Sequence, residues 1–111
     1  MTRDDLARLF DLWRAGDEVA SAAYFTEDGV FQEAQREPIV GRATIAAHWA
    51  PFFHGGPAWR MTVHECFGGG DRFAVVYTWE IETPDGWTGK PGCAIVHVRD
   101  GKIALWREYK G

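Results

Sequence analysis

Apolar residues near the start of the chain recur at the three- and four-residue spacing of an amphipathic helix. The pattern predicts a first helix that ends near Ala15-Gly16, and its apolar face is made of Leu6, Leu9, Phe10 and Trp13. Thr2 is followed three residues later by Asp5. This spacing resembles a capping box at the start of the helix, with Asp in place of the usual Glu.

A second, shorter helix is predicted after Gly16. Asp17 is a suitable N-cap for a helix that runs through about Phe25. The residues expected to be buried on it are Val19, Ala22, Ala23 and Phe25. The acidic turn at residues 27–29 then leads into a strand over residues 30–33, and residues 39–40 form a second short strand beside it.

A third helix is predicted over residues 42–53, directly after Gly41. Helical spacing places four of its residues on one face, namely Ile45, His48, Trp49 and Phe52. From residue 58 the apolar period changes from 3.6 to 2, which predicts strands over residues 59–67, 72–83, 87–99 and 102–109. Glycine-rich and Asp-Gly segments between these runs are typical of hairpin turns. We therefore expect an α+β fold in which three helices cover one face of a curved, largely antiparallel sheet.

Length and charge narrow the classes of function. The chain has 111 residues, enough for one domain over residues 1–111 with one core. Twelve Lys and Arg against sixteen Asp and Glu give a net charge of -4, so nucleic acid and anionic membranes are poor partners. The N-terminus is acidic and no apolar run approaches the ~20 residues of a membrane span. We expect a cytoplasmic protein, with no membrane partner and no nucleic acid partner.

The two cysteines, Cys66 and Cys93, lie 27 residues apart and have no further Cys or His at the spacing of metal ligands. This pattern favours two reduced thiols over a zinc site or a disulfide. We expect neither a metal nor another cofactor.

Two long segments resemble a known family. They are AGDEVASAAYFTEDGVFQEAQREPIVGRATIAAHW at residues 15–49 and HVRDGKIALWREYKG at residues 97–111. Both are similar to the nuclear transport factor 2-like superfamily, and within it to the SnoaL-like branch, which includes polyketide cyclases and is related to ketosteroid isomerase. The resemblance implies a cone-shaped fold: a bent sheet wraps around three helices and leaves a deep apolar cavity open at one end.

The resemblance also implies a position for a catalytic base. Glu33 matches the base carboxylate of ketosteroid isomerase near the end of the first strand. The two hydrogen-bond donors of that enzyme's oxyanion hole are not matched, because their positions fall at Leu9 and Val96. Steroid isomerisation by that mechanism is therefore not expected.

Strand alternation predicts which side chains reach the cavity, since residues two apart share a face. Phe31 and Glu33 share one face of the first strand, and the bulky set Val75, Tyr77, Trp79 and Ile81 is expected to face the helices. Alternation alone leaves the face of the last strand open. The resemblance turns Trp106 and Glu108 inward.

Glu33 and Glu108 are thus candidates for two carboxylates in one cavity. Burial without a partner raises the pKa of a Glu, and a neighbouring like charge raises it further. A carboxylate tuned in this way is a credible general acid or base. Two plainer interpretations remain open: Glu33 pairs at the mouth with Arg36 or Arg42, and Glu108 is a solvated residue paired with Arg107 or Lys110.

Other side chains are candidates for ligand contacts. His48 is the best histidine for an acid–base role, because it lies on the third helix next to Trp49. Phenol and indole donors could bind a carbonyl group, and aromatic rings could line the cavity. The candidates for ligand binding are Trp13, Tyr24, Phe31, Trp49, Phe52, Tyr77, Trp79 and Trp106.

Three hypotheses follow from the sequence. The first is a cofactor-free isomerase, cyclase or lyase that transfers protons on a small hydrophobic carbonyl compound, with Glu33 as base. The second is a non-catalytic domain that binds an apolar ligand, and the third is a dimerising module whose cavity is filled by its own aromatic side chains. The convex face of the sheet, with Ala74, Val76, Cys93 and Ile95, is the expected homodimer interface.

Overall fold

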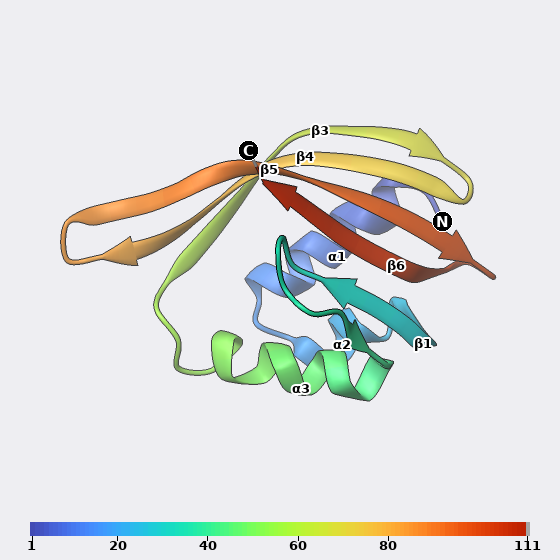
Figure 1. The fold of residues 1–111 in the computed structure, drawn as a ribbon, viewed down its shortest axis with the longest axis horizontal. Coiled ribbons are helices and arrows are strands. Elements are labelled where there is room, and N and C mark those ends of the chain that lie inside the picture. Colours follow the sequence, from blue (N-terminus) through green and yellow to red (C-terminus); the bar gives the residue numbers. More distant parts are fainter. Residues whose placement is uncertain (111) are drawn as a thin grey trace.

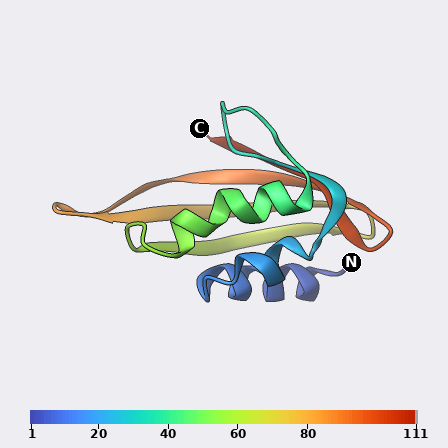
Figure 2. The same ribbon diagram turned by 90° about the horizontal axis from the view of Figure 1, so that it is seen from below.

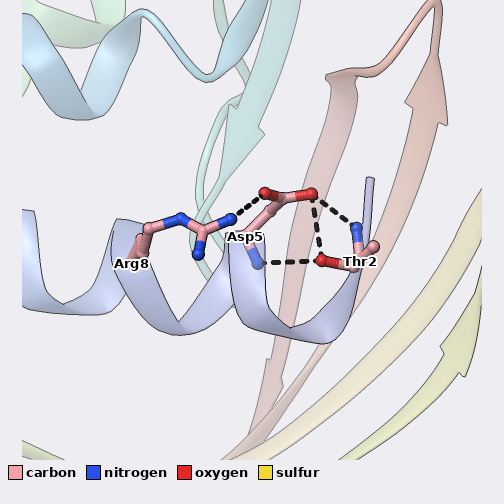
Figure 3. Close-up of polar contacts among 3 residues, drawn as sticks. All are labelled: Thr2, Asp5 and Arg8. Carbon is pink, nitrogen blue, oxygen red and sulfur yellow. Dashed lines mark hydrogen bonds and ion pairs between the residues drawn. The ribbon is translucent and has the colours of Figure 1, made fainter.

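The computed structural model describes residues 1–110, and the first helix, α1 (Arg3–Arg14), begins at the predicted capping box. The Asp5 N–H donates to the Thr2 hydroxyl at 3.2 Å, and the Thr2 N–H donates to the Asp5 carboxylate at 2.7 Å (Figure 3). Arg8 also donates to Asp5. These bonds, the one from the Thr2 backbone above all, lower the pKa of Asp5. The predicted capping box is confirmed.

The second helix, α2 (Glu18–Ala22), is shorter than predicted. Asp17 is its N-cap and accepts a hydrogen bond from the Ala20 N–H at 2.9 Å, but the prediction that the helix reaches Phe25 is wrong. Backbone pairing with the last strand competes for the chain here, since the Ile103 N–H donates to the Tyr24 carbonyl at 2.8 Å. Of the four residues expected to be buried here, Ala22 and Phe25 are buried, whereas Ala23 is exposed and Val19 is 71% exposed.

The first strand, β1 (Phe25–Gln32), starts five residues earlier than predicted and ends just before Glu33. Residues 27–29, expected to form a turn, lie inside it, where the register against the last strand shifts between Phe25 and Val30. The short strand β2 (Ile39–Val40) pairs antiparallel with β1. Helix α3 (Arg42–Phe53) has the predicted bounds.

The second half of the chain forms the predicted series of hairpins: β3 (Trp59–Gly69), β4 (Arg72–Thr83), β5 (Gly86–Arg99) and β6 (Lys102–Lys110). Within residues 1–110 the strand order is β2-β1-β6-β5-β4-β3. Strand β1 runs parallel to β6, and all other neighbours are antiparallel. The expected α+β fold is confirmed.

All three helices lie on one side of the sheet, as Figures 1 and 2 show. The far end of the β4–β5 hairpin extends beyond the helices. Between the two layers lies the core, in which Leu6, Leu9, Ile45, Val96 and Trp106 are fully buried. No helix within residues 1–110 is long and apolar enough to cross a membrane.

Candidate functional site

A cavity of about 490 Å³ opens between the helices and the concave face of the sheet, in the size range of small-molecule sites. Each layer supplies aromatic side chains to its walls. The predicted ligand-binding residues that line it are Trp13, Phe31, Trp49, Phe52, Tyr77 and Trp79. Glu33, His48 and Glu108 line the same cavity.

Two predicted ligand-binding residues lie outside this lining. Tyr24 sits at the junction of α2 and β1, partly buried against the core. Trp106 is fully buried behind the cavity wall, where its indole N–H donates to the Glu108 carboxylate at 3.0 Å. Trp106 therefore contributes to the site through Glu108.

Several lining residues escaped the sequence analysis: Ala34, Arg36, Phe53, Trp59, Met61 and Lys110. Two of them, Trp59 and Met61, carried a usable signal. Trp59 pairs with Ile81, and Met61 pairs with Trp79, across the β3–β4 ladder. Because directly paired residues point to the same face of a sheet, the inward orientation of Trp79 and Ile81 implies the same for Trp59 and Met61.

The walls of the cavity are held by contacts between aromatic rings. Trp49 packs edge-to-face against Trp13 and Phe31, with ring centroids 5.6 and 5.2 Å apart. Trp13 in turn packs edge-to-face against Trp106 at 5.1 Å. Such pairs have preferred geometries, so they fix the shape of the space that a ligand would occupy.

Glu33 and His48 form a pair at the cavity mouth. The Glu33 Oε1 lies 3.0 Å from the His48 Nε2, and the two side chains are 36% and 40% exposed. Neither Arg36 nor Arg42 forms an ion pair with Glu33 among the contacts of residues 1–110, and Arg42 instead donates to the Phe25 carbonyl. Glu33 is a mouth residue, but its partner is a titratable group on α3.

Glu108 lies deeper and its surroundings change its acidity. Burial raises the pKa of Glu108, the hydrogen bond from Trp106 opposes that rise, and the negative charge of Glu33 adds to it. The predicted alternative partner Arg107 donates to the Gln32 side chain at 3.0 Å instead. Lys110, the other alternative, lowers the pKa of Glu108 through its charge but makes no ion pair with it in the described part of the chain.

Tyr77 lies beside Glu108. Burial raises the pKa of the Tyr77 phenol, and the Glu108 charge raises it further. The phenol therefore keeps its proton and remains a hydrogen-bond donor. Together the site holds two carboxylates, an imidazole and a phenol around one aromatic cavity, a set of groups that can accept and donate protons.

A second hollow, more open to solvent, lies near the turn between β5 and β6. Arg42, Arg99 and Lys102 line it together with Glu27, Asp28 and Asp100. Its charges are largely matched, since Arg99 pairs with Asp28 and Arg42 donates to a backbone carbonyl. It lacks the aromatic walls and the raised carboxyl pKa of the first cavity, so we assign the candidate site to the first.

Comparisons with known proteins agree with this architecture. Residues 6–106 match the family model described as a SnoaL-like domain. No curated protein matches the chain closely enough to add to this comparison.

Solved structures show the same fold at low sequence identity. A protein from Catenulispora acidiphila with a ketosteroid isomerase-like fold, in complex with trimethylamine, is 17% identical with a TM-score of 0.84, and the match covers 100% of this chain and 88% of that one. SalBIII, an epoxide hydrolase/cyclase-like enzyme of pyran ring formation in salinomycin, is 19% identical with a TM-score of 0.82 over 98% and 89%. An epoxide hydrolase from M. tuberculosis is 19% identical with a TM-score of 0.81 over 96% and 79%.

Proposed function

Since this chain belongs to the SnoaL-like domain family, we propose that it is a cofactor-independent enzyme that transfers protons on a small hydrophobic carbonyl compound. Keto–enol isomerisation, aldol-type cyclisation and β-elimination of such compounds begin with removal of a proton from the carbon next to the carbonyl group. Glu33 is the proposed base. Glu108 is the proposed second group that exchanges a proton in the same cavity.

One observation carries the proposal: two carboxylates line a single aromatic cavity, and neither is neutralised by an Arg or Lys ion pair among the described residues. The pKa of Glu108 is raised by burial and by the charge of Glu33. One carboxyl group, Glu108, is the more buried, and the other, Glu33, is partly exposed beside His48. Two carboxyl groups in such different surroundings are suited to separate acid and base roles.

His48 supports Glu33 in the proposed reaction. The 3.0 Å contact between the two side chains lets the imidazole orient the carboxylate or take up the proton that it removes. Two of the structurally similar proteins are described as an epoxide hydrolase and an epoxide hydrolase/cyclase-like enzyme. Ring opening of an epoxide also needs an acid and a base in a small cavity, so these descriptions favour proton-transfer chemistry as a class.

The competing proposal is a binding domain without catalysis. It is favoured by Leu9 and Val96, which stand at the two donor positions of ketosteroid isomerase and are fully buried apolar core residues here. A domain that only holds an apolar ligand would need the cavity but neither carboxylate. The third hypothesis, a cavity filled by its own side chains, is weakened by the volume of about 490 Å³.

We also propose that the protein is a homodimer. On the convex side of the sheet Ala74, Val76, Cys93 and Ile95 are only partly buried within one chain. A second copy of the chain would cover this apolar strip.

The test of the catalytic proposal is proton exchange on a model ketone. β-Tetralone, a bicyclic ketone small enough for the cavity, is incubated in deuterium oxide with the protein, and loss of its hydrogens next to the carbonyl is followed by proton NMR. We expect catalysed exchange that falls at least ~10²-fold in Glu33→Gln. Glu37→Gln, which changes an exposed carboxylate outside the cavity lining, is the matched control and retains the rate. Binding of the ketone without exchange would instead favour the binding domain.

A further inference from the structure

Two hydrogen-bond donors in the cavity wall have no hydrogen-bond partner among residues 1–110. The Trp13 indole Nε1 and the Tyr77 hydroxyl are buried and form no hydrogen bond within residues 1–110. Trp13 is 7% exposed and Tyr77 is 3% exposed. Both side chains line the cavity, so the two unpaired donors belong to the candidate site and not to a remote part of the core.

Unpaired buried donors are rare, because each gives up its hydrogen bonds to water and receives nothing in return. Neighbouring donors in the site are satisfied. The Trp106 N–H is bonded to Glu108, and the His48 Nε2 is within hydrogen-bond distance of Glu33. Of these four donor side chains, only those of Trp13 and Tyr77 lack a hydrogen-bond partner among residues 1–110.

The two donors come from opposite layers, and each lies close to Glu108 or to the residue that binds it. Trp13, on α1, packs edge-to-face on Trp106, the residue that holds Glu108. The Tyr77 hydroxyl, on β4, approaches the Glu108 carboxylate, whose charge and side-chain contact raise the pKa of the phenol, although no hydrogen bond of ordinary geometry joins the two groups. Both therefore lie near Glu108, and the charge of Glu33 also reaches Tyr77 and adds to the rise in its pKa.

We propose that Tyr77 and Trp13 form a recognition subsite that donates hydrogen bonds to the oxygen of a carbonyl group on an apolar ligand. The inference deepens the proposed function and rests on it for the identity of the cavity as a ligand site. It supplies two donors in place of those missing at Leu9 and Val96: Trp13 lies on α1, as Leu9 does, and Tyr77 lies on β4, the neighbour of the strand that carries Val96. The ligand class is a compact, ring-containing ketone or ester whose carbonyl enters first.

The charge in this part of the cavity favours a neutral acceptor. An ionised Glu108 next to the subsite repels a ligand anion, whereas a carbonyl oxygen accepts from the two donors without that cost. If the carbonyl becomes an enolate during proton transfer, a protonated Glu108 removes the repulsion. The raised pKa of Glu108 is in accord with this requirement.

Gly92 leaves room for the Tyr77 side chain. It lies opposite Tyr77 on the neighbouring strand, and a Cβ at this position would lie 3.2 Å from both the Cζ and the hydroxyl oxygen of Tyr77. Gly92→Ala is therefore expected to displace the hydroxyl slightly without removing it. This makes Gly92 a positioning residue for the subsite.

The test compares β-tetralone with tetralin, the same bicycle without the oxygen, in calorimetric binding to the whole chain. We expect the wild type to bind the ketone about tenfold more tightly than the hydrocarbon, as one added hydrogen bond of average strength provides. Tyr77→Phe and Trp13→Phe each lose most of that preference, and Gly92→Ala loses part of it. Tyr109→Phe, which removes an exposed hydroxyl outside the cavity lining, keeps it.

Stability measurements separate recognition from a structural role. Because the Tyr77 hydroxyl forms no hydrogen bond in the described part of the chain, Tyr77→Phe is expected to leave the melting temperature unchanged or raise it. A melting temperature several degrees lower would reveal a structural partner and contradict the proposal. Tyr77→Phe is the decisive variant, because Trp13→Phe also removes packing surface.

The possible binding results distinguish this inference from the proposed function. Equal affinities of the wild type for β-tetralone and tetralin would overturn the subsite but leave the cavity as a ligand site. Failure to bind either compound would overturn both proposals. A ketone preference that depends on Tyr77, without catalysed deuterium exchange, would support the subsite and overturn the catalytic proposal.

Discussion

Glu108 illustrates how burial and neighbouring groups adjust one residue. In the folded chain burial disfavours its charged form, and the like charge of Glu33 adds to this, while Trp106 donates to the carboxylate. The net result is a pKa above the ordinary 4.5. A carboxyl group of this kind is less stable as an anion in the fold than in the unfolded chain.

This shift predicts a pH-dependent difference in stability between the wild type and Glu108→Gln. The folded protein holds the Glu108 proton more tightly than the unfolded chain does, so the wild type loses stability relative to the variant as the pH rises from about 4.5 through the raised pKa. Each unit by which the pKa is raised contributes about 1.4 kcal/mol to the difference. Urea unfolding of both proteins across this pH range measures it.

The direction in which the stability difference between the wild type and Glu108→Gln changes with pH tests the prediction. Groups common to both proteins, such as Asp5 with its lowered pKa, cancel in the comparison. A difference that grows toward acid pH would mean that the fold stabilises the Glu108 anion, which would contradict the proposed surroundings of this residue.

Individual site residues were only partly predictable from the sequence. Alternation placed Phe31 and Glu33 on one face, and both line the cavity. The partner of Glu33 was not predictable, because His48 lies 15 residues away on α3 and the contact depends on how that helix packs. The unpaired donors of Trp13 and Tyr77 are likewise visible only when all their neighbours are known.

At the scale of elements, the β4–β5 hairpin depends on a close approach at Gly89. This residue pairs with Glu80, and a Cβ on it would lie 2.0 Å from the Trp79 carbonyl oxygen. Trp79 lines the cavity. The close packing of the Gly89 backbone against the Trp79 backbone therefore places the β4–β5 hairpin directly beside the cavity wall.

Gly89→Ala is therefore expected to destabilise the fold by about 1–3 kcal/mol, the usual cost of overpacking. Gly69→Ala is the matched control, because Gly69 is also a strand glycine and a Cβ there meets nothing within 4 Å. Its effect is expected to stay within about 0.5 kcal/mol. Urea unfolding compares the two. Equal stabilities of the variants would show that the β4–β5 pairing relaxes around the added methyl group.

Elements were predicted well where local signals were strong. Residues 42–53 follow a helical pattern after Gly41, and residues 72–83 alternate between turn-forming segments; both bounds agree with the structure. The boundary between α2 and β1 was missed. Residues 23–25 are compatible with a helix locally, and the distant pairing of Phe25 with Ile103 draws them into the sheet.

At the scale of the whole molecule, the concave and convex faces of the sheet differ in how far their side chains are buried. Val75 and Tyr77 are buried toward the helices, whereas Ala74 and Val76 on the other face are only partly buried. The family resemblance anticipated the cavity between the layers. Sequence alternation could not reveal its volume, which depends on how the aromatic rings of both layers interlock.

The proposed homodimer predicts a mass twice that of the 12.5 kDa chain in sedimentation at high micromolar concentration. Ile95→Lys places a charge on the convex face and is expected to give a monomer. Val19→Lys, at a residue on α2 that is 71% exposed, makes the same chemical change elsewhere and leaves the mass unchanged. A monomeric wild type would contradict the proposed interface.

The central claim is that Glu33 and Glu108 act on one ligand in one cavity, and a double-variant cycle tests it most directly. Deuterium exchange of β-tetralone is measured for the wild type, Glu33→Gln, Glu108→Gln and the double variant. Groups that act as a unit give non-additive losses, so we predict that the double variant is no slower than the slower single variant. Losses that multiply, or single variants that retain the wild-type rate, would contradict the claim.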